Sequence, residues 1–222
     1  MKKYVLLLAG AVFAAPTPAS AMHLEAGGGV RWYTPTANGT WYQKGLPYNL
    51  RLTGLTGSVG VTGRINRHLR WSARYVYLGL ASSNSLDTGD PNYNPQTQGC
   101  NGKCWPLANF TGHGTVQGFA FVLQPQVALG SGVHAFLEAG PWVYRPTWHM
   151  QVDHWVSCPT AQPVNLTINH DPRWQLGWTG GVGVRLGRTS VALDVYDTRA
   201  MGDAWPAVYT GAYTLTIREW FL

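Results

Sequence analysis

Charged residues are scarce in this sequence: Asp, Glu, Lys and Arg together make up 12% of the 222 residues. Soluble domains usually carry about 25–35% of these residues on their surfaces. The low content argues against an exterior that faces water throughout, and it indicates that something else covers much of the outside. The formal net charge of +6 falls to +4 once Lys2 and Lys3 are removed with the leader described next, an excess too small to indicate a nucleic-acid partner.

Long apolar runs are also missing, and none approaches the roughly 18 residues that a transmembrane helix requires. Residues 1–21 begin with two lysines, continue with an apolar run over 4–15 and end in Ala-Ser-Ala. This pattern predicts a secretory signal peptide that is cleaved before Met22. The remaining 201 residues (222 less 21), 22–222, have the length of a single domain.

Cysteine occurs three times, at Cys100, Cys104 and Cys158. Export places these thiols in an oxidising compartment, where an odd number leaves one of them over, and the sequence alone does not identify which one. We expect a Cys100–Cys104 disulfide, because four positions around an Asn-Gly turn allow close approach. A zinc site is a weaker interpretation, since this pair lacks a second pair of ligands.

Alternation of apolar with polar or tiny residues is clearest between Arg173 and Gly187, where the even positions are apolar or Gly. This is the period of a β-strand. A tight turn at 187–189 leads to a second alternating run that shares the apolar face. The opposite face of this hairpin carries Arg185 and Asp194 among small residues, which suits the lining of a narrow, polar barrel interior.

The same alternation marks eight strands in the mature chain. We expect them at about His23–Tyr33, Leu50–Thr62, Leu69–Tyr77, Gly114–Leu129, Val133–Tyr144, Arg173–Gly187, Thr189–Asp197 and Tyr209–Phe221. Four long connections, at 34–49, 81–112, 145–172 and 198–208, alternate with short turns. This asymmetry and strands of about 9–11 residues or a little more are typical of bacterial outer-membrane barrels. The sequence therefore predicts an all-β fold, an eight-stranded antiparallel up-and-down transmembrane β-barrel.

Aromatic residues gather near the ends of the predicted strands. They are Trp32, Tyr77, Phe119 and Trp174 at the loop end, and Trp71 and Phe221 at the turn end. These positions predict two girdles at the membrane interfaces.

The signal peptide, the eight alternating strands and the last strand, YTLTIREWFL with an aromatic at Phe221, resemble the small outer-membrane barrels of the OmpA and opacity-protein type. The resemblance covers the whole mature chain and implies the outer membrane of a Gram-negative bacterium. One departure is Leu222, because the family usually ends on the aromatic residue itself.

The segments 135–144 and 181–197 are similar to strands five to seven of the lipid A deacylase (PagL-like) barrels. Those enzymes use a His-x-Ser pair, and the matching residues here are Tyr196 and Thr198. Because no His beside Thr198 would take its proton, we expect no catalytic residues and no enzymatic activity.

Eight charged residues fall on the predicted inner faces. They are Glu25, Arg31, Arg70, Arg74, Glu138, Arg185, Asp194 and Arg218. Buried charged side chains that water does not solvate must form ion pairs. We therefore expect a salt-bridge and hydrogen-bond network that fills the barrel and prevents the conduction of ions. We assign His134, on the same face as Glu138, to this plug rather than to an acid–base pair.

The predicted loops carry several histidines and tryptophans. They are His113, His149, His154 and His170, and Trp41, Trp105, Trp148, Trp155 and Trp205. The histidines show no recognisable ligand spacing, so we expect no metal and no cofactor. The aromatic rings suit contact with sugars, lipid headgroups or a partner protein, or they pack the loops against each other.

We therefore expect a monomeric, integral outer-membrane protein with a structural or surface-interaction role through four long external loops. It would contact outer-membrane lipid and lipopolysaccharide, and bind no nucleic acid. A lipid A deacylase-like hydrolase is one alternative. A secreted lipocalin-like binder of small ligands is another, because Gly39-Thr40-Trp41 is similar to the Gly-x-Trp motif of lipocalins.

Overall fold

The computed structural model of the chain describes residues 22–35, 48–88, 105–170, 173–198 and 209–221. Ten β-strands and no helix form within these ranges. Accordingly, no helix among them has the length and hydropathy to cross a membrane. The predicted signal peptide and most of the predicted loops 34–49 and 198–208 lie outside the described residues.

Eight of the strands close into a ring. They are β1 (His23–Pro35), β3 (Thr53–Asn66), β4 (Leu69–Asp87), β5 (Ala108–Gly130), β6 (Val133–Trp155), β8 (Gln175–Leu186), β9 (Thr189–Asp197) and β10 (Tyr209–Phe221). Each pairs antiparallel with the next, and β1 pairs with β10 to close the ring. The predicted eight-stranded up-and-down barrel is confirmed.

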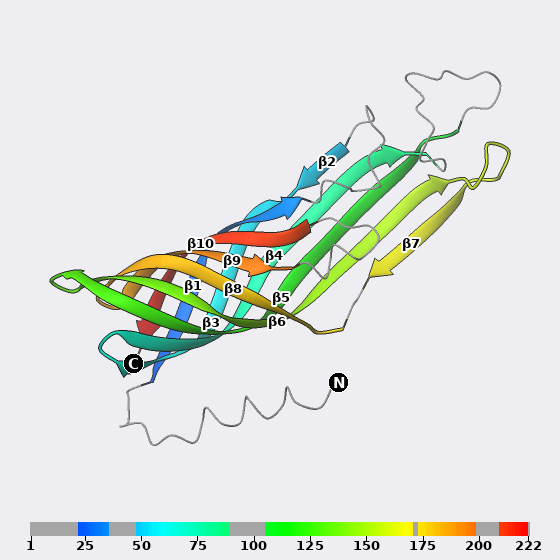
Figure 1. The fold of residues 1–222 in the computed structure, drawn as a ribbon. Helices are drawn as coiled ribbons and strands as arrows, with labels where there is room; N and C mark the ends of the chain where they lie inside the picture. The colour runs from blue at the N-terminus through cyan, green and yellow to red at the C-terminus, as the bar shows by residue number, and fades with distance from the viewer. Residues whose placement is uncertain (1–21, 36–47, 89–104, 171–172, 199–208, 222) are drawn as a thin grey trace.

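Short turns join β3 to β4, β5 to β6 and β8 to β9 at one end of the barrel, which we call the turn end (Figure 1). Gly132 and Gly187 occupy two of these turns with φ of 78° and 58°. A side chain is disfavoured at such angles, which explains the glycines.

The predicted loops 81–112 and 145–172 were too long, because much of each is strand. Beyond the barrel, β4, β5 and β6 continue and are joined by β2 (Tyr48–Arg51) on β4 and β7 (Val164–His170) on β6 (Figure 1). We call this five-stranded part, residues 48–51, 80–87, 108–117, 145–155 and 164–170, the projecting sheet. Its polar composition is typical of loops, but hydrogen-bonded pairing with neighbouring strands makes it extended.

One face of the projecting sheet packs as a core that continues from the barrel interior. Trp148 is fully buried there, and its indole lies against Gly112 and Gly114. A Cβ atom on Gly114 would lie 2.1 Å from the Thr147 carbonyl oxygen and 2.5 Å from the Trp148 ring. Glycine is therefore required where this ring approaches the backbone.

Candidate functional site: the barrel interior and the projecting sheet

The eight charged residues predicted to face inward all lie inside the barrel, and none is more than 7% exposed. Six strands contribute them: β1 carries Glu25 and Arg31, β4 carries Arg70 and Arg74, and β6, β8, β9 and β10 carry Glu138, Arg185, Asp194 and Arg218. Their contacts divide them into three groups, of which the first two meet at Trp220.

The central group is built around Glu138, which faces Arg74 and Arg218 across the lumen. The Arg218 Nη1 atom lies 2.8 Å from Glu138 Oε2, and both Nη atoms of Arg74 donate to the same carboxylate. Gln124 of β5 adds a donor at 2.8 Å. Two guanidinium groups thus neutralise one buried carboxylate, as a buried charge requires.

Two further carboxylates attach to the central group. Asp194 accepts from the second Nη of Arg218 and from the Thr214 hydroxyl at 3.4 Å. Glu25 lies 3.6 Å from Arg74 Nη1 and accepts from the Trp220 indole at 3.1 Å. Arginines and carboxylates therefore alternate across the barrel.

A second group lies toward the turn end, where Arg70 and Arg185 are placed against Trp220. Their guanidinium carbons lie 4.0 Å and 4.8 Å from the centroid of its ring, an arrangement that gives cation–π attraction. Two of the three nitrogens of Arg70 have no hydrogen-bond partner among the described residues. Trp220 carries no distinguishing signal in the sequence, although the alternation of β10 turns it inward with Arg218.

Arg31 forms the third group, at the base of the projecting sheet. Its guanidinium donates to the carbonyl oxygens of Leu52, Leu78 and Leu80, and lies 4.2 Å from the centroid of the Tyr33 ring. Arg31 therefore joins β1 to the segment where β4 leaves the barrel.

Aromatic side chains fill the barrel above the charges, on the side away from the turn end. Trp142 stacks on Tyr144 with ring centroids 5.4 Å apart, meets Tyr196 edge-on at 4.9 Å, and donates to the Asp197 carbonyl at 3.0 Å. Tyr196 and Thr198, the positions that match the deacylase pair, are both buried. This layer was missed in the sequence, where the same residues were ordinary members of alternating runs.

The outer face of the projecting sheet is polar. Leu80 is exposed at its base, and its other exposed residues include Asn49, Arg51, Asn84, Thr111, His113, His149, Gln151, Thr167 and Asn169. His113 and His149 lie opposite each other on β5 and β6, with ring centroids 5.6 Å apart. The structure thus brings together two of the four loop histidines, whereas His154 lies farther along β6.

The described parts of the predicted loops hold two further titratable groups. Cys158, between β6 and β7, is an exposed free thiol, and its hydrogen bond with the Thr160 hydroxyl lowers its pKa. Asp87 ends β4, where burial raises its pKa to about 6 against the opposing effect of the Thr88 N–H. The predicted Cys100–Cys104 disulfide lies outside the described residues and stays a prediction.

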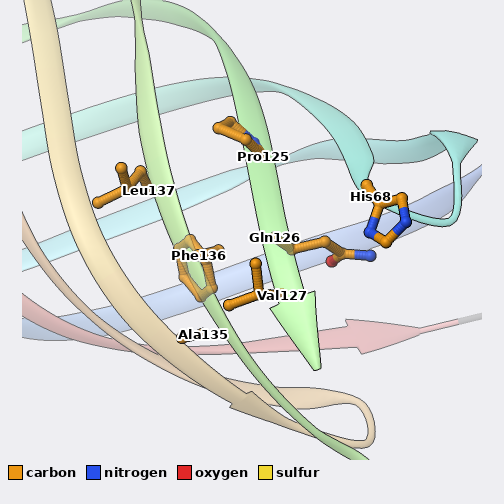
Figure 2. A pocket seen from close by; sticks show the side chains of 7 residues that line it. All are labelled: His68, Pro125, Gln126, Val127, Ala135, Phe136 and Leu137. Atoms are coloured by element: carbon orange, nitrogen blue, oxygen red, sulfur yellow. The ribbon is translucent and has the colours of Figure 1, made fainter. Parts of the chain in front are cut away.

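A hollow of about 450 Å³ opens on the outside of the barrel at the turn end (Figure 2). It is lined by His68, Pro125, Gln126, Val127, Ala135, Phe136 and Leu137. Figure 2 shows the Gln126 side chain extended toward His68, and the Gln126 N–H donates to the His68 carbonyl at 2.8 Å. The lining is mostly apolar with His68 as its single titratable side chain, so it offers no acid–base pair.

No family model and no curated protein matches the chain. Among solved structures, it is similar to Ail, the attachment invasion locus protein of Yersinia pestis, in complex with the heparin analogue sucrose octasulfate. The TM-score is 0.37 and the identity 9%, over 91% of this chain and 99% of that chain. A likeness of this degree does not indicate what the chain binds.

Proposed function

We propose that the chain is an integral outer-membrane barrel of a Gram-negative bacterium, of the OmpA and opacity-protein type, with a structural or surface-interaction role. In this proposal the barrel spans the membrane as a non-conducting monomer in contact with lipid and lipopolysaccharide. The projecting sheet and its loops stand outside the cell and present the surface for a ligand or partner protein.

The observation that carries this proposal is the inverted polarity of the barrel. Val59, Leu137 and Ile217 face outward and are 59%, 59% and 60% exposed, while the arginines and carboxylates described above are buried inside. An apolar outside around a polar interior is the arrangement of transmembrane barrels. Ring closure supports it further, because a bilayer tolerates no unpaired strand edge.

The outward-facing residues change from apolar to polar where the projecting sheet begins, which supports a membrane boundary there. Phe119 lies just below this level, with ring centroids 5.3 Å from Tyr75 and 6.0 Å from Trp174. Trp71 of β4 stacks on Phe121 at 6.2 Å, and Phe221, 48% exposed, lies at the turn end of β10. Outward aromatic residues toward both ends of an apolar band suit the two interfaces.

A matched pair of leucine substitutions tests the membrane assignment. Leu193 on β9 is 45% exposed within the apolar band, and Leu107, next to β5 at the far end of the projecting sheet, is 40% exposed. Leu193→Lys should destabilise the protein folded in lipid vesicles, lowering its free energy of unfolding by about 2–4 kcal/mol, because a charge then faces hydrocarbon. Leu107→Lys should change it by less than about 0.5 kcal/mol. Equal effects at the two positions would contradict a lipid-facing band.

The sidedness of the projecting sheet can be tested with the native thiol of Cys158, which is exposed beyond the barrel. A membrane-impermeant maleimide should label it on intact cells. Labelling only after the outer membrane is opened would place the projecting sheet in the periplasm and refute the surface role.

The two alternative functions fit the geometry less well. A lipocalin-like binder needs an apolar cavity inside and a polar exterior, and this barrel has the reverse polarity. A lipid A hydrolase needs a nucleophile and a base where the acyl ester lies. Tyr196 and Thr198 are buried inside the barrel, away from its lipid-facing side, and we propose that the chain is not an enzyme.

A further inference from the structure

We propose that His113 and His149 form a binding site for a divalent transition-metal ion, Cu²⁺ or Zn²⁺, on the outer face of the projecting sheet. The two imidazoles supply the protein ligands, and Asn169 on the next strand orients one of them. The site is distinct from the barrel interior, and it does not depend on whether the barrel lies in a membrane.

The register of β5 and β6 places the two histidines side by side. They are direct cross-strand partners, both exposed, with ring centroids 5.6 Å apart and ring planes inclined by 32°. Directly opposed residues have Cβ atoms about 4.5–5.5 Å apart, so their side chains start close together. The strand pairing therefore holds the spacing before any ion arrives.

The separation of the rings matches that of two imidazoles on one ion. An imidazole nitrogen binds zinc at about 2.0–2.1 Å, which puts the ring centroid about 3.2 Å from the ion. Two rings at a tetrahedral angle then have centroids about 5.2 Å apart. The observed 5.6 Å differs from this by a few tenths of an ångström, so the spacing of the two rings suits one shared ion.

Asn169 orients His149 and holds its ring in the tautomer that a metal needs. The Asn169 Oδ1 atom lies 2.8 Å from His149 Nδ1, and β7 holds Asn169 directly opposite His149. A carbonyl oxygen only accepts, so Nδ1 carries the hydrogen and Nε2 keeps its lone pair free. Metal-binding histidines commonly donate their other ring N–H to such an oxygen.

The surroundings admit a cation. The two rings line an open hollow of about 520 Å³ with Thr111, Gln151 and Thr167, and no Lys or Arg is among the described residues of its lining. No third His, Cys, Asp or Glu completes a ligand set among the described residues. Imidazole nitrogens favour Cu²⁺ and Zn²⁺, whereas Mg²⁺ and Ca²⁺ prefer oxygen. The ion would therefore keep open positions for water or for a donor from a bound partner.

Calorimetric titration of the folded protein in detergent with CuCl₂ and with ZnCl₂ tests the site. The protein should carry no affinity tag, and its thiols should be alkylated so that cysteines do not contribute. We expect one ion per chain. His113→Ala and His149→Ala should each weaken binding by about tenfold or more, because each removes one of two ligands. His68→Ala, which removes an exposed histidine from a turn, is the matched control and should leave the affinity unchanged.

Two variants of Asn169 test whether this residue orients His149 for metal binding or only supports the fold. Asn169→Leu removes the acceptor and should weaken binding by about 10–100-fold, while Asn169→Asp keeps an acceptor and should retain it. Electron paramagnetic resonance of bound Cu²⁺ should report two imidazole ligands in the unmodified protein and one in each single His→Ala variant. Far-UV circular dichroism should show that all variants stay folded. Equal metal affinity in the unmodified protein and in the His113→Ala/His149→Ala double variant would overturn the proposal.

Discussion

At the scale of the residue, Glu138 is the point where the charges of the barrel interior meet. It accepts hydrogen bonds from Arg74, Arg218 and Gln124, which come from three different strands. Such a carboxylate contributes little if the whole set is compared with a packed apolar core, but removing it alone takes away the carboxylate that Arg74 and Arg218 share and leaves them only Glu25 and Asp194.

Replacing this carboxylate should therefore be costly. Glu138→Gln should lower the free energy of unfolding by about 3–5 kcal/mol, since Arg74 and Arg218 lose their shared counter-charge. Urea unfolding from lipid vesicles measures the effect. Glu219→Gln, at an exposed position on β10, provides the control and should stay within about 0.5 kcal/mol of the unmodified protein. A small effect at Glu138 would mean that the interior charges are hydrated rather than paired.

At the scale of the element, β4 is one strand of 19 residues that runs through both the barrel and the projecting sheet. Its pairing with β5 shifts between Tyr77 and Leu80, and Gly79 between them has a φ of 81°. The Tyr33 hydroxyl donates to the Gly79 carbonyl at 3.2 Å, and Arg31 donates to carbonyls on both sides of it. These donors on β1 hold the bulge at which the projecting sheet leaves the barrel.

Arg31→Lys should loosen the base of the projecting sheet. The ammonium group keeps the charge, but it cannot direct donors to three separate carbonyl oxygens as a guanidinium does. Hydrogen exchange should show faster exchange in residues 80–87 and 108–115, with 69–77 unchanged. Each lost bond from a charged donor corresponds to about 1.5–3 kcal/mol. Arg51→Lys, at an exposed position on β2, is the control and should exchange like the unmodified protein. Unchanged exchange rates of residues 80–87 in Arg31→Lys would contradict this role of Arg31.

At the scale of the whole molecule, two layers obstruct the barrel. The central ion pairs join β1, β4, β6, β9 and β10 across the lumen, and the rings of Trp142, Tyr144 and Tyr196 fill the level above. An eight-stranded barrel has an interior only wide enough for side chains. These layers therefore support a barrel without a continuous water path.

Planar-bilayer recording tests this expectation. The reconstituted protein should give no stable unitary openings above the protein-free baseline, because ions would have to displace paired charges and packed rings. A large open porin in the same bilayer serves as the positive control. Reproducible large openings would instead assign the chain a transport role.

Much of this architecture follows from the sequence because a strand has a period of two. That period assigned Glu138, Arg218 and Leu193 to their sides of the barrel and located all eight barrel strands. The same reasoning missed the projecting sheet, where glycines such as Gly112 and Gly114 and polar partners are typical of a loop. There the strands are extended because they pair with each other, and composition carries little information about pairing.

The sequence by itself determined which face each residue occupies, and with it the polar interior, the apolar exterior and the closed eight-stranded ring. Only the tertiary structure decided which residues meet, because register depends on the hydrogen-bond ladder between strands and not on the alternation within one. It placed the Arg31 guanidinium against the carbonyl oxygens of Leu52, Leu78 and Leu80 at the base of the projecting sheet. It also placed His113 opposite His149, two residues whose distance along the chain shows no ligand spacing.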